Sequence, residues 1–187
     1  MTQRLSTLED VEAAVWDELQ RCVRERGHAW RTCVLASMAP DQDGQPVADA
    51  RLVVLREADT VARQLRIYTD SRARKVSQLR SNPVATLVMW SAELGWQLRC
   101  SVVCSVEDDG LAVSSRWTHI RLSPGAQDYL SPTAPGTPLA GHTPAAAQRE
   151  HFALITATIT CIDWMELNAD GHRRAVFGDG PARWVQP

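Results

Sequence analysis

Residues 97–106 read QLRCSVVCSV, and their side chains alternate between apolar and polar along most of the stretch. One parity is entirely apolar: Leu98, Cys100, Val102, Cys104 and Val106. Because successive side chains of a strand point to opposite faces of a sheet, the pattern predicts a strand with one buried face, whose other face could line a polar site. Just upstream, residues 84–90 read VATLVMW, a seven-residue run typical of a strand buried on both faces.

The flanking sequence extends this pattern into a barrel. Further strands are predicted at residues 32–39, 50–57, 64–69, 152–167 and 173–177. Ser6 and Glu9 match a capping box before a helical stripe, and Ser71 is expected to cap a short helix over residues 72–80. Residues 108–120 form a weaker helical pattern. Hairpins join most of the roughly seven strands, and closure into a barrel removes exposed sheet edges, so we predict an α+β barrel with peripheral helices.

Composition excludes several classes of protein. The 187 residues are 44% hydrophobic and 22% charged, which is typical of one globular domain over residues 1–187. The net charge of −2 offers no general field for nucleic acid or anionic lipid. No apolar run approaches the roughly 20 residues of a membrane span, and no apolar signal core follows Met1, so a cytoplasmic location is expected. Five cysteines without a C-x-x-C pair predict apolar filler and no metal site.

The densest functional signal is residues 68–75, YTDSRARK, at the junction of a predicted strand and helix. A helix N-terminus attracts phosphate, and the basic side chains of Arg74 and Lys75 would add an anion clamp. Of the 20 basic residues in the chain, only Lys75 is a lysine. The alternative interpretation is a solvated basic helix face. Arg51 could approach the same clamp from a neighbouring strand and Gln97 could bond a planar heterocycle, although both residue types more often face water.

These residues stand in an order that resembles the pyridoxamine 5′-phosphate oxidase family of FMN-binding split barrels. The shared motifs are Arg51-x-Val-x-Leu, Tyr68-Thr-Asp-x-x-x-Arg-Lys75, Asn82-Pro83, Trp90 and Gln97-Leu-Arg99. The resemblance covers roughly residues 30–106 and, more thinly, the chain from Phe152 onward. It implies a predominantly antiparallel split β-barrel and a homodimer with FMN at the interface. The cofactor contacts that it implies are Arg51, Val53, Val54, Tyr68, Thr69, Arg74, Lys75 and Gln97, with Trp164 reaching the site of the partner chain.

The departures from the family pattern concern the substrate. A family Tyr-x3-Arg-x3-Ser motif corresponds to Trp117, Arg121 and Gly125, and a C-terminal Arg-x-His-x-Arg motif is replaced by HRRAVF at residues 172–177. Each lost donor to a buried phosphate costs about 1–3 kcal/mol. FMN binding is therefore expected without oxidation of pyridoxamine phosphate. Arg121 and Arg173 are the remaining candidates for contact with a substrate, and the Pro-rich residues 124–144 are expected to form part of a changed pocket.

Two functions follow from this sequence. The first is an FMN-dependent oxidoreductase acting on a small molecule, for which no residue stands out as catalytic. The alternative is a flavin- or haem-binding protein without turnover. Haem would need an axial ligand from one of the available histidines, His119, His142, His151 or His172. A nucleic-acid module is disfavoured by the net charge.

Overall fold

The computed structural model describes residues 4–123, 126, 129–138, 151–178 and 180–187. Its helices are α1 (Leu8–Arg24), the single turn η1 (Ala29–Arg31), α2 (Arg74–Ser81) and α3 (Gly110–Ile120). Its strands are β1 (Thr32–Pro40), β2 (Pro46–Asp59), β3 (Gln64–Asp70), β4 (Val84–Ser91), β5 (Trp96–Glu107), β6 (Phe152–Glu166), β7 (Arg173–Gly178) and β8 (Gly180–Val185). None of the described helices is long and apolar enough to cross a membrane.

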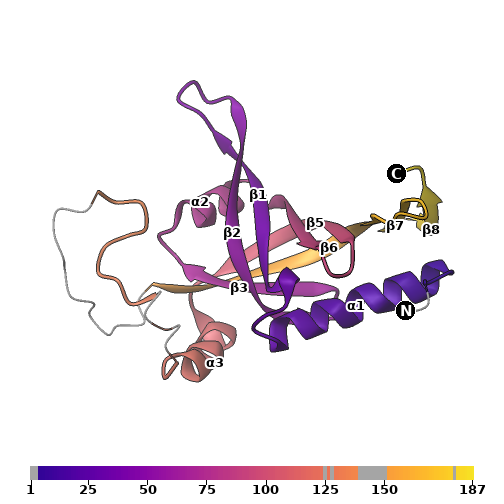
Figure 1. Ribbon diagram of the computed structural model, residues 1–187. Coiled ribbons are helices and arrows are strands. Elements are labelled where there is room, and N and C mark those ends of the chain that lie inside the picture. Colours follow the sequence, from indigo (N-terminus) through magenta and orange to yellow (C-terminus); the bar gives the residue numbers. More distant parts are fainter. Residues whose placement is uncertain (1–3, 124–125, 127–128, 139–150, 179) are drawn as a thin grey trace.

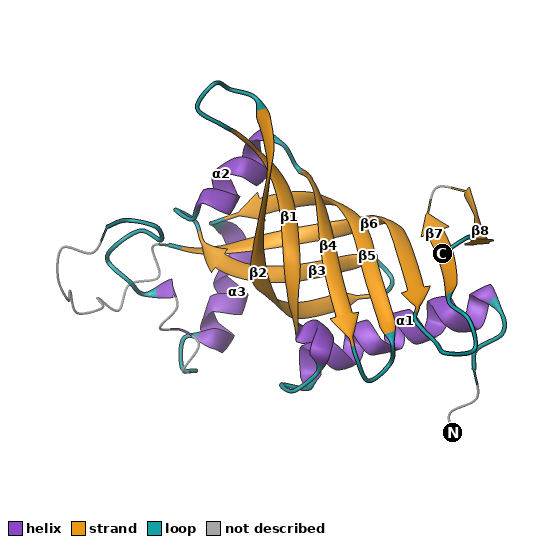
Figure 2. Ribbon diagram, turned by 45° about the horizontal axis from the view of Figure 1, so that its top comes forward, coloured by secondary structure: helices purple, strands orange, loops and turns teal. Residues whose placement is uncertain are grey.

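The strands form one antiparallel sheet that closes on itself. Their order is β3-β2-β1-β4-β5-β6-β7-β8, and β3 also pairs with β6 from Gln64↔Thr158 to Asp70↔Phe152. Six strands therefore make a closed barrel, and β7 and β8 extend from β6 as a separate hairpin (Figure 2). The predicted α+β split barrel is confirmed.

The barrel interior is filled by the parity that the alternation of residues 97–106 predicts. Leu98, Cys100 and Val102 on β5 are at most 1% exposed. Burial also raises the pKa of the thiol groups, to about 12 for Cys22 and Cys33, so these cysteines stay protonated and act as apolar filler.

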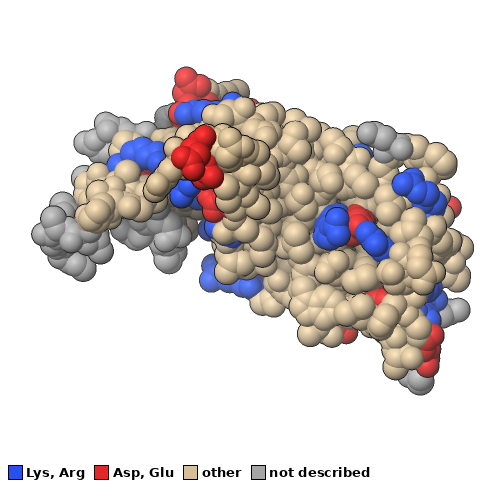
Figure 3. Space-filling model, turned by 90° about the horizontal axis from the view of Figure 1, so that it is seen from above, with Lys and Arg blue, Asp and Glu red and all other residues tan. Residues whose placement is uncertain are grey.

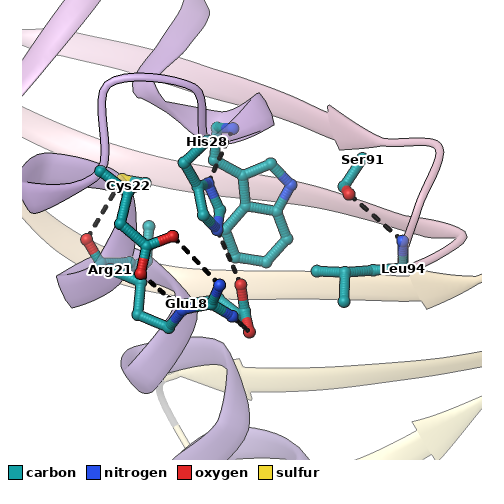
Figure 4. A network of polar contacts seen from close by, with 9 residues as sticks. Glu18, Arg21, Cys22, His28, Ser91 and Leu94 are labelled. Atoms are coloured by element: carbon teal, nitrogen blue, oxygen red, sulfur yellow. Dashed lines mark hydrogen bonds and ion pairs between the residues drawn. The ribbon is translucent and has the colours of Figure 1, made fainter.

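Helix α1 closes one end of the barrel, along the lower side in Figure 1. Its buried stripe includes Val11, Val15 and Leu19. The following turn is fixed to the helix because the imidazole of His28 lies 2.7 Å from the Glu18 carboxylate, and Arg21 bonds the same carboxylate (Figure 4). The backbone N–H of Trp30 donates to His28 Nδ1, which directs the chain into β1.

Local details differ from the predictions at three places. Thr7, one residue after the expected Ser6, caps α1 by accepting from Asp10 N–H at 3.1 Å. Helix α2 begins at Arg74 with no side-chain cap, so the expected cap at Ser71 is wrong. The C-terminal strand β8 lies beyond the strands that the sequence predicted.

Strand β4 also contradicts its prediction, because it is buried on one face only. Val84 is 59% exposed and Trp90 is 46% exposed, while Leu87 and Met89 between them are buried. Helix α2 and the other described helices leave this outer face of the sheet open, as Figure 2 shows. An apolar run with one uncovered face indicates a surface available to another molecule.

Candidate functional site

A cavity of about 330 Å³ lies where β2, the end of β3 and the start of α2 meet. Five of the residues that the sequence singled out line it: Val53, Val54, Tyr68, Thr69 and Lys75. The other lining residues are Leu52, Arg56, Ile67, Asp70, Ala73, Tyr129 and Pro135. The sequence motif and the strand pairing thus converge on one partly open pocket with a largely apolar wall and a cationic end.

Lys75 supplies the charge at that end. It lies in the first turn of α2, where the helix dipole is positive, and its ammonium donates to Thr69 Oγ1 at 3.0 Å. That is its one hydrogen bond among the described residues, which leaves N–H groups for a ligand. Burial, followed by the nearby Arg51 charge, lowers the pKa of Lys75 below its usual value. The negative charge of a phosphate would oppose both effects by stabilising the charged ammonium.

Arg51 stands behind Lys75 and is held by partners of its own chain. One terminal nitrogen donates to Leu35 O and to Ser37 Oγ, at 3.2 and 2.7 Å. The other donates to Gln78 Oε1 at 2.8 Å and forms an ion pair of 2.8 Å with Asp49. As the structure stands, Arg51 contributes its charge to the site rather than free donors.

Arg74 is the most exposed of the three cations, with 74% of its side chain accessible. Its Nε lies 3.9 Å from the Asp49 carboxylate, and the side chain borders a groove between α2 and the β1–β2 hairpin. A long exposed side chain of this kind is free to turn toward a phosphate at the start of α2.

The neighbouring Arg72 has a different role from the clamp. It forms a bidentate pair with the buried Asp70, at 2.7 and 3.0 Å. It also donates to the carbonyls of Ser131 and Pro132. Arg72 therefore ties the segment that carries Tyr129 to the end of β3, beside the cavity.

Four of the nine predicted cofactor contacts do not line this cavity: Arg51 and Arg74, described above, and Gln97 and Trp164. Gln97 is half-buried on β5, paired in register with Trp90 on the outer face of the sheet. Trp164 is fully buried in the core, with its ring 5.3 Å from that of Trp96 and 6.3 Å from that of Trp184. The packing of Trp164 inside its own barrel does not bring it to a surface where a partner's site could use it.

The structure does not bring the two predicted substrate residues to the cavity. Arg121 is exposed where α3 ends, and Gly125 lies outside the described residues. Arg173 pairs with Glu166 at 2.9 and 3.1 Å, and its guanidinium lies 5.7 and 5.5 Å from the rings of Trp164 and Trp184. Arg173 thus fastens the C-terminal hairpin to the barrel.

Arg56 is a cavity residue that the sequence analysis missed. Its Nε is buried without a hydrogen-bond partner among the described residues, and its guanidinium lies 6.0 Å from the centre of the Tyr68 ring. Arg56 has the same strand parity as Leu52 and Val54, and all three line the cavity. The β2–β3 register shifts between Leu55 and Glu57, so a bulge brings Glu57 onto the same face, beside Tyr68. The parity that Arg56 shares with Val54 is visible in the sequence, but the sequence does not show which face of β2 borders the cavity.

The carboxylate next to Arg56 is fully engaged. Glu57 accepts from the Tyr68 hydroxyl at 2.7 Å and from Arg116 on α3 at 2.5 and 2.7 Å. Burial alone would raise the pKa of Glu57, but the hydrogen bonds from Arg116 and Tyr68 outweigh it and hold that pKa below its usual value. Glu57 stays ionised and paired, so Arg56 is left without an ion-pair partner among the residues that the structure describes.

Comparison with known proteins agrees with this geometry. Residues 13–107, half of the chain, match the family model described as pyridoxamine 5′-phosphate oxidase, FMN-binding domain. The chain belongs to this family. FMN is therefore its cofactor, and the residues present fit that group, because Lys75 with open donors stands beside a helix N-terminus at one end of an apolar cavity.

Its relatives in sequence match over a short region. The pyridoxine/pyridoxamine 5′-phosphate oxidases of Nostoc punctiforme and Trichormus variabilis are 40% and 42% identical, over 75 and 67 residues. Those regions cover 40% and 36% of this chain, but only 32% and 28% of the two relatives. The match thus spans about a third of the curated proteins.

Similar solved structures cover the chain throughout. A pyridoxamine 5′-phosphate oxidase-related, FMN-binding protein of N. punctiforme has a TM-score of 0.72 at 20% identity, covering 99% of this chain and 100% of that one. PhzG of Burkholderia lata, in complex with tetrahydrophenazine-1-carboxylic acid, has a TM-score of 0.75 at 16% identity, covering 100% and 99%. At these identities the likeness establishes the fold.

A structural role for Arg173 can be tested by substitution. We expect Arg173→Leu to lower the free energy of unfolding by about 1–3 kcal/mol, because Glu166 loses a buried partner and two indole rings lose a cation. FMN affinity should stay at its wild-type value. Urea denaturation and flavin titration measure the two quantities. If the variant keeps its stability but binds FMN more weakly, Arg173 contributes to ligand binding and the structural role is wrong.

The position of Lys75 predicts how FMN affinity depends on pH. The ammonium binds phosphate only when protonated, and its lowered pKa means that affinity falls as pH rises through a range below that of an ordinary lysine, about 10.4. Riboflavin, which lacks the phosphate, corrects for titration of the ring. In Lys75→Arg this alkaline loss should disappear, with weaker but detectable binding at neutral pH. Parallel pH profiles for FMN and riboflavin in the wild-type protein would contradict the assignment.

Proposed function

We propose that this protein is an FMN-dependent oxidoreductase that acts on a small molecule as a homodimer. In this proposal the described residues form a single FMN-binding domain. The observation that carries the proposal is the cavity itself, which is lined by Lys75 with open donors and by Arg56, whose Nε has no hydrogen-bond partner among the described residues. Bound FMN supplies two-electron redox chemistry at its ring.

The clamp assigns roles to the predicted contacts. Lys75 and Arg74 donate to the cofactor phosphate, and Arg51 adds its charge from behind. Val53 and Val54 on β2, with Tyr68 and Thr69 on the neighbouring strand β3, would line the site of the ring. Trp164 stands outside this proposal because its ring is enclosed in the core.

The other end of the cavity supports a substrate with an anionic group. Arg56 has a buried Nε that seeks an acceptor, and a positive charge beside the ring also favours the reduced, anionic flavin. Tyr129 and Pro135 border the same volume. PhzG, of the same fold, is known in complex with a heterocyclic carboxylic acid.

Neither Arg121 nor Arg173 lines the cavity, so the oxidation of pyridoxamine phosphate is not part of the proposal.

The non-catalytic haem-binding alternative has little support in the described part of the chain. None of its histidines lines the cavity. His119 is exposed on α3, and His172 Nδ1 accepts from the Asn168 backbone in a turn. His142 lies outside the described residues.

A second copy of the chain is the occupant that we propose for the open outer face of the sheet. Leu52, Val84, Trp90 and Val103 are 44–69% exposed on neighbouring strands of this face. Figure 3 shows that its middle is uncharged apart from one group of basic and acidic side chains. Leu52 also lines the cavity, so a partner on this face would cover the cofactor and bring its own Gln97 near it.

The dimer is tested by placing a charge on that face. We expect Leu52→Asp and Trp90→Asp to shift the protein to monomer mass, because each buries a carboxylate without a partner. FMN affinity should fall with the dimer. Sedimentation and flavin titration are the measurements, and Val61→Asp, at a site 95% exposed outside this face, is the matched control. Leu52→Asp that keeps wild-type mass would exclude this face as the interface.

Oxidoreductase activity is tested on the holoprotein. Candidate electron donors are screened under anaerobic conditions for bleaching of the flavin absorbance. The candidates are oxidisable small carboxylic acids, oxidisable small phosphates and reduced nicotinamides. We expect at least one class of anionic donor to reduce the flavin, and Arg56→Met to slow that reduction at least tenfold while FMN stays bound. The Arg74→Glu/Lys75→Glu double variant should lose FMN and all reduction. A flavin that no donor reduces and that oxygen does not reoxidise after chemical reduction would favour the non-catalytic alternative.

A further inference from the structure

Asp49 occupies an unusual position beside the proposed phosphate clamp. Its carboxylate pairs with Arg51 at 2.8 Å, lies 3.9 Å from Arg74 Nε and accepts from Gln78 Nε2 at 2.6 Å. Two of the three cations proposed to serve the phosphate are therefore already paired with an anion of the same chain. The remaining cation, Lys75, has no carboxylate within ion-pair distance among the described residues.

Of the four partners of Arg51, Asp49 is the one that can leave. Ser37 and Gln78 are 3% and 5% exposed, and the carbonyl of Leu35 belongs to β1, whose register with β2 pairs Leu35 with Arg51 itself. Asp49 is 32% exposed at its side chain and lies on the part of β2 that leads to the hairpin, where a swing into water costs little. The hydrogen bond from Gln78, together with the charge of Arg51, holds the pKa of Asp49 below its usual value, so it is an anion at neutral pH.

We propose that Asp49 is an internal counter-ion that takes the place of the cofactor phosphate on Arg51 and Arg74, and that FMN must displace it to bind. The inference rests on the clamp proposed above. Without FMN, the carboxylate relieves repulsion among Arg51, Arg74 and Lys75. With FMN, it is a like charge beside a dianion and lowers the affinity. Asp49 thereby sets how readily the cofactor exchanges.

The test is a titration of the flavin-free full-length protein with FMN and, separately, with riboflavin, followed by flavin fluorescence. We expect Asp49→Asn to bind FMN about tenfold more tightly, since it removes one negative charge near the phosphate and retains the shape of the side chain. Asp49→Ser should behave alike and replaces the first variant if that one folds poorly. Asp49→Glu keeps the charge and should bind FMN as the wild type does. Riboflavin affinity should be the same in all of them.

Asp108→Asn is the matched control, because Asp108 pairs with Arg80 at 2.7 Å at the other end of α2. It should leave FMN affinity unchanged. Weaker FMN binding in Asp49→Asn would show that Asp49 positions Arg51 for the phosphate, and unchanged binding would show that it does not face the phosphate. Either result overturns the inference. If Arg74→Glu/Lys75→Glu keeps its FMN, the clamp itself fails, which is a separate outcome.

Discussion

The pairing of β3 with β6 is the constraint on which the rest of the structure depends. It joins the edge strand β3 to β6 and so closes the six strands β3-β2-β1-β4-β5-β6 into a barrel, and it runs without interruption from Gln64 to Asp70. The strand is thereby fixed to its last residue, so that Thr69 and the buried Asp70 stand at a defined point on the barrel rim. Helix α2 starts from that point, and Lys75 follows with it. The cofactor cavity is a consequence of barrel closure.

Ion pairs around α2 determine which cation of the site is left for a ligand. Asp70 neutralises Arg72, which in turn holds the segment of Tyr129, whereas Asp49 neutralises Arg51. Neither of these carboxylates pairs with Lys75, and burial destabilises its charged form unless an anion binds beside it. A site of this kind favours phosphate over neutral ligands. The same arrangement explains why the chain retains an ammonium here and uses arginine elsewhere, since an ammonium is compact enough to share one hydroxyl and still donate to a ligand.

The sequence predicted those parts of the molecule that depend on local pattern. The alternation around Leu98 and Cys100 identified the core face of β5, and the YTDSRARK motif identified three residues of the cavity. What it missed depends on distant contacts. The bulge that brings Glu57 to Tyr68 arises from the β2–β3 register, and the contact of Asp49 with Arg51 and Gln78 joins β2 to α2. The capture of Arg173 by Glu166 and two tryptophans likewise joins residues from separate strands.

The most direct test of the account is the visible absorption spectrum of the purified protein, followed by identification of the chromophore released on denaturation. The account predicts flavin bands and the release of FMN, held by a phosphate that Lys75 and Arg74 recognise. If the protein is purified colourless, added FMN should restore the bands. A protein that neither carries nor takes up FMN, or one that shows a haem spectrum, would contradict it.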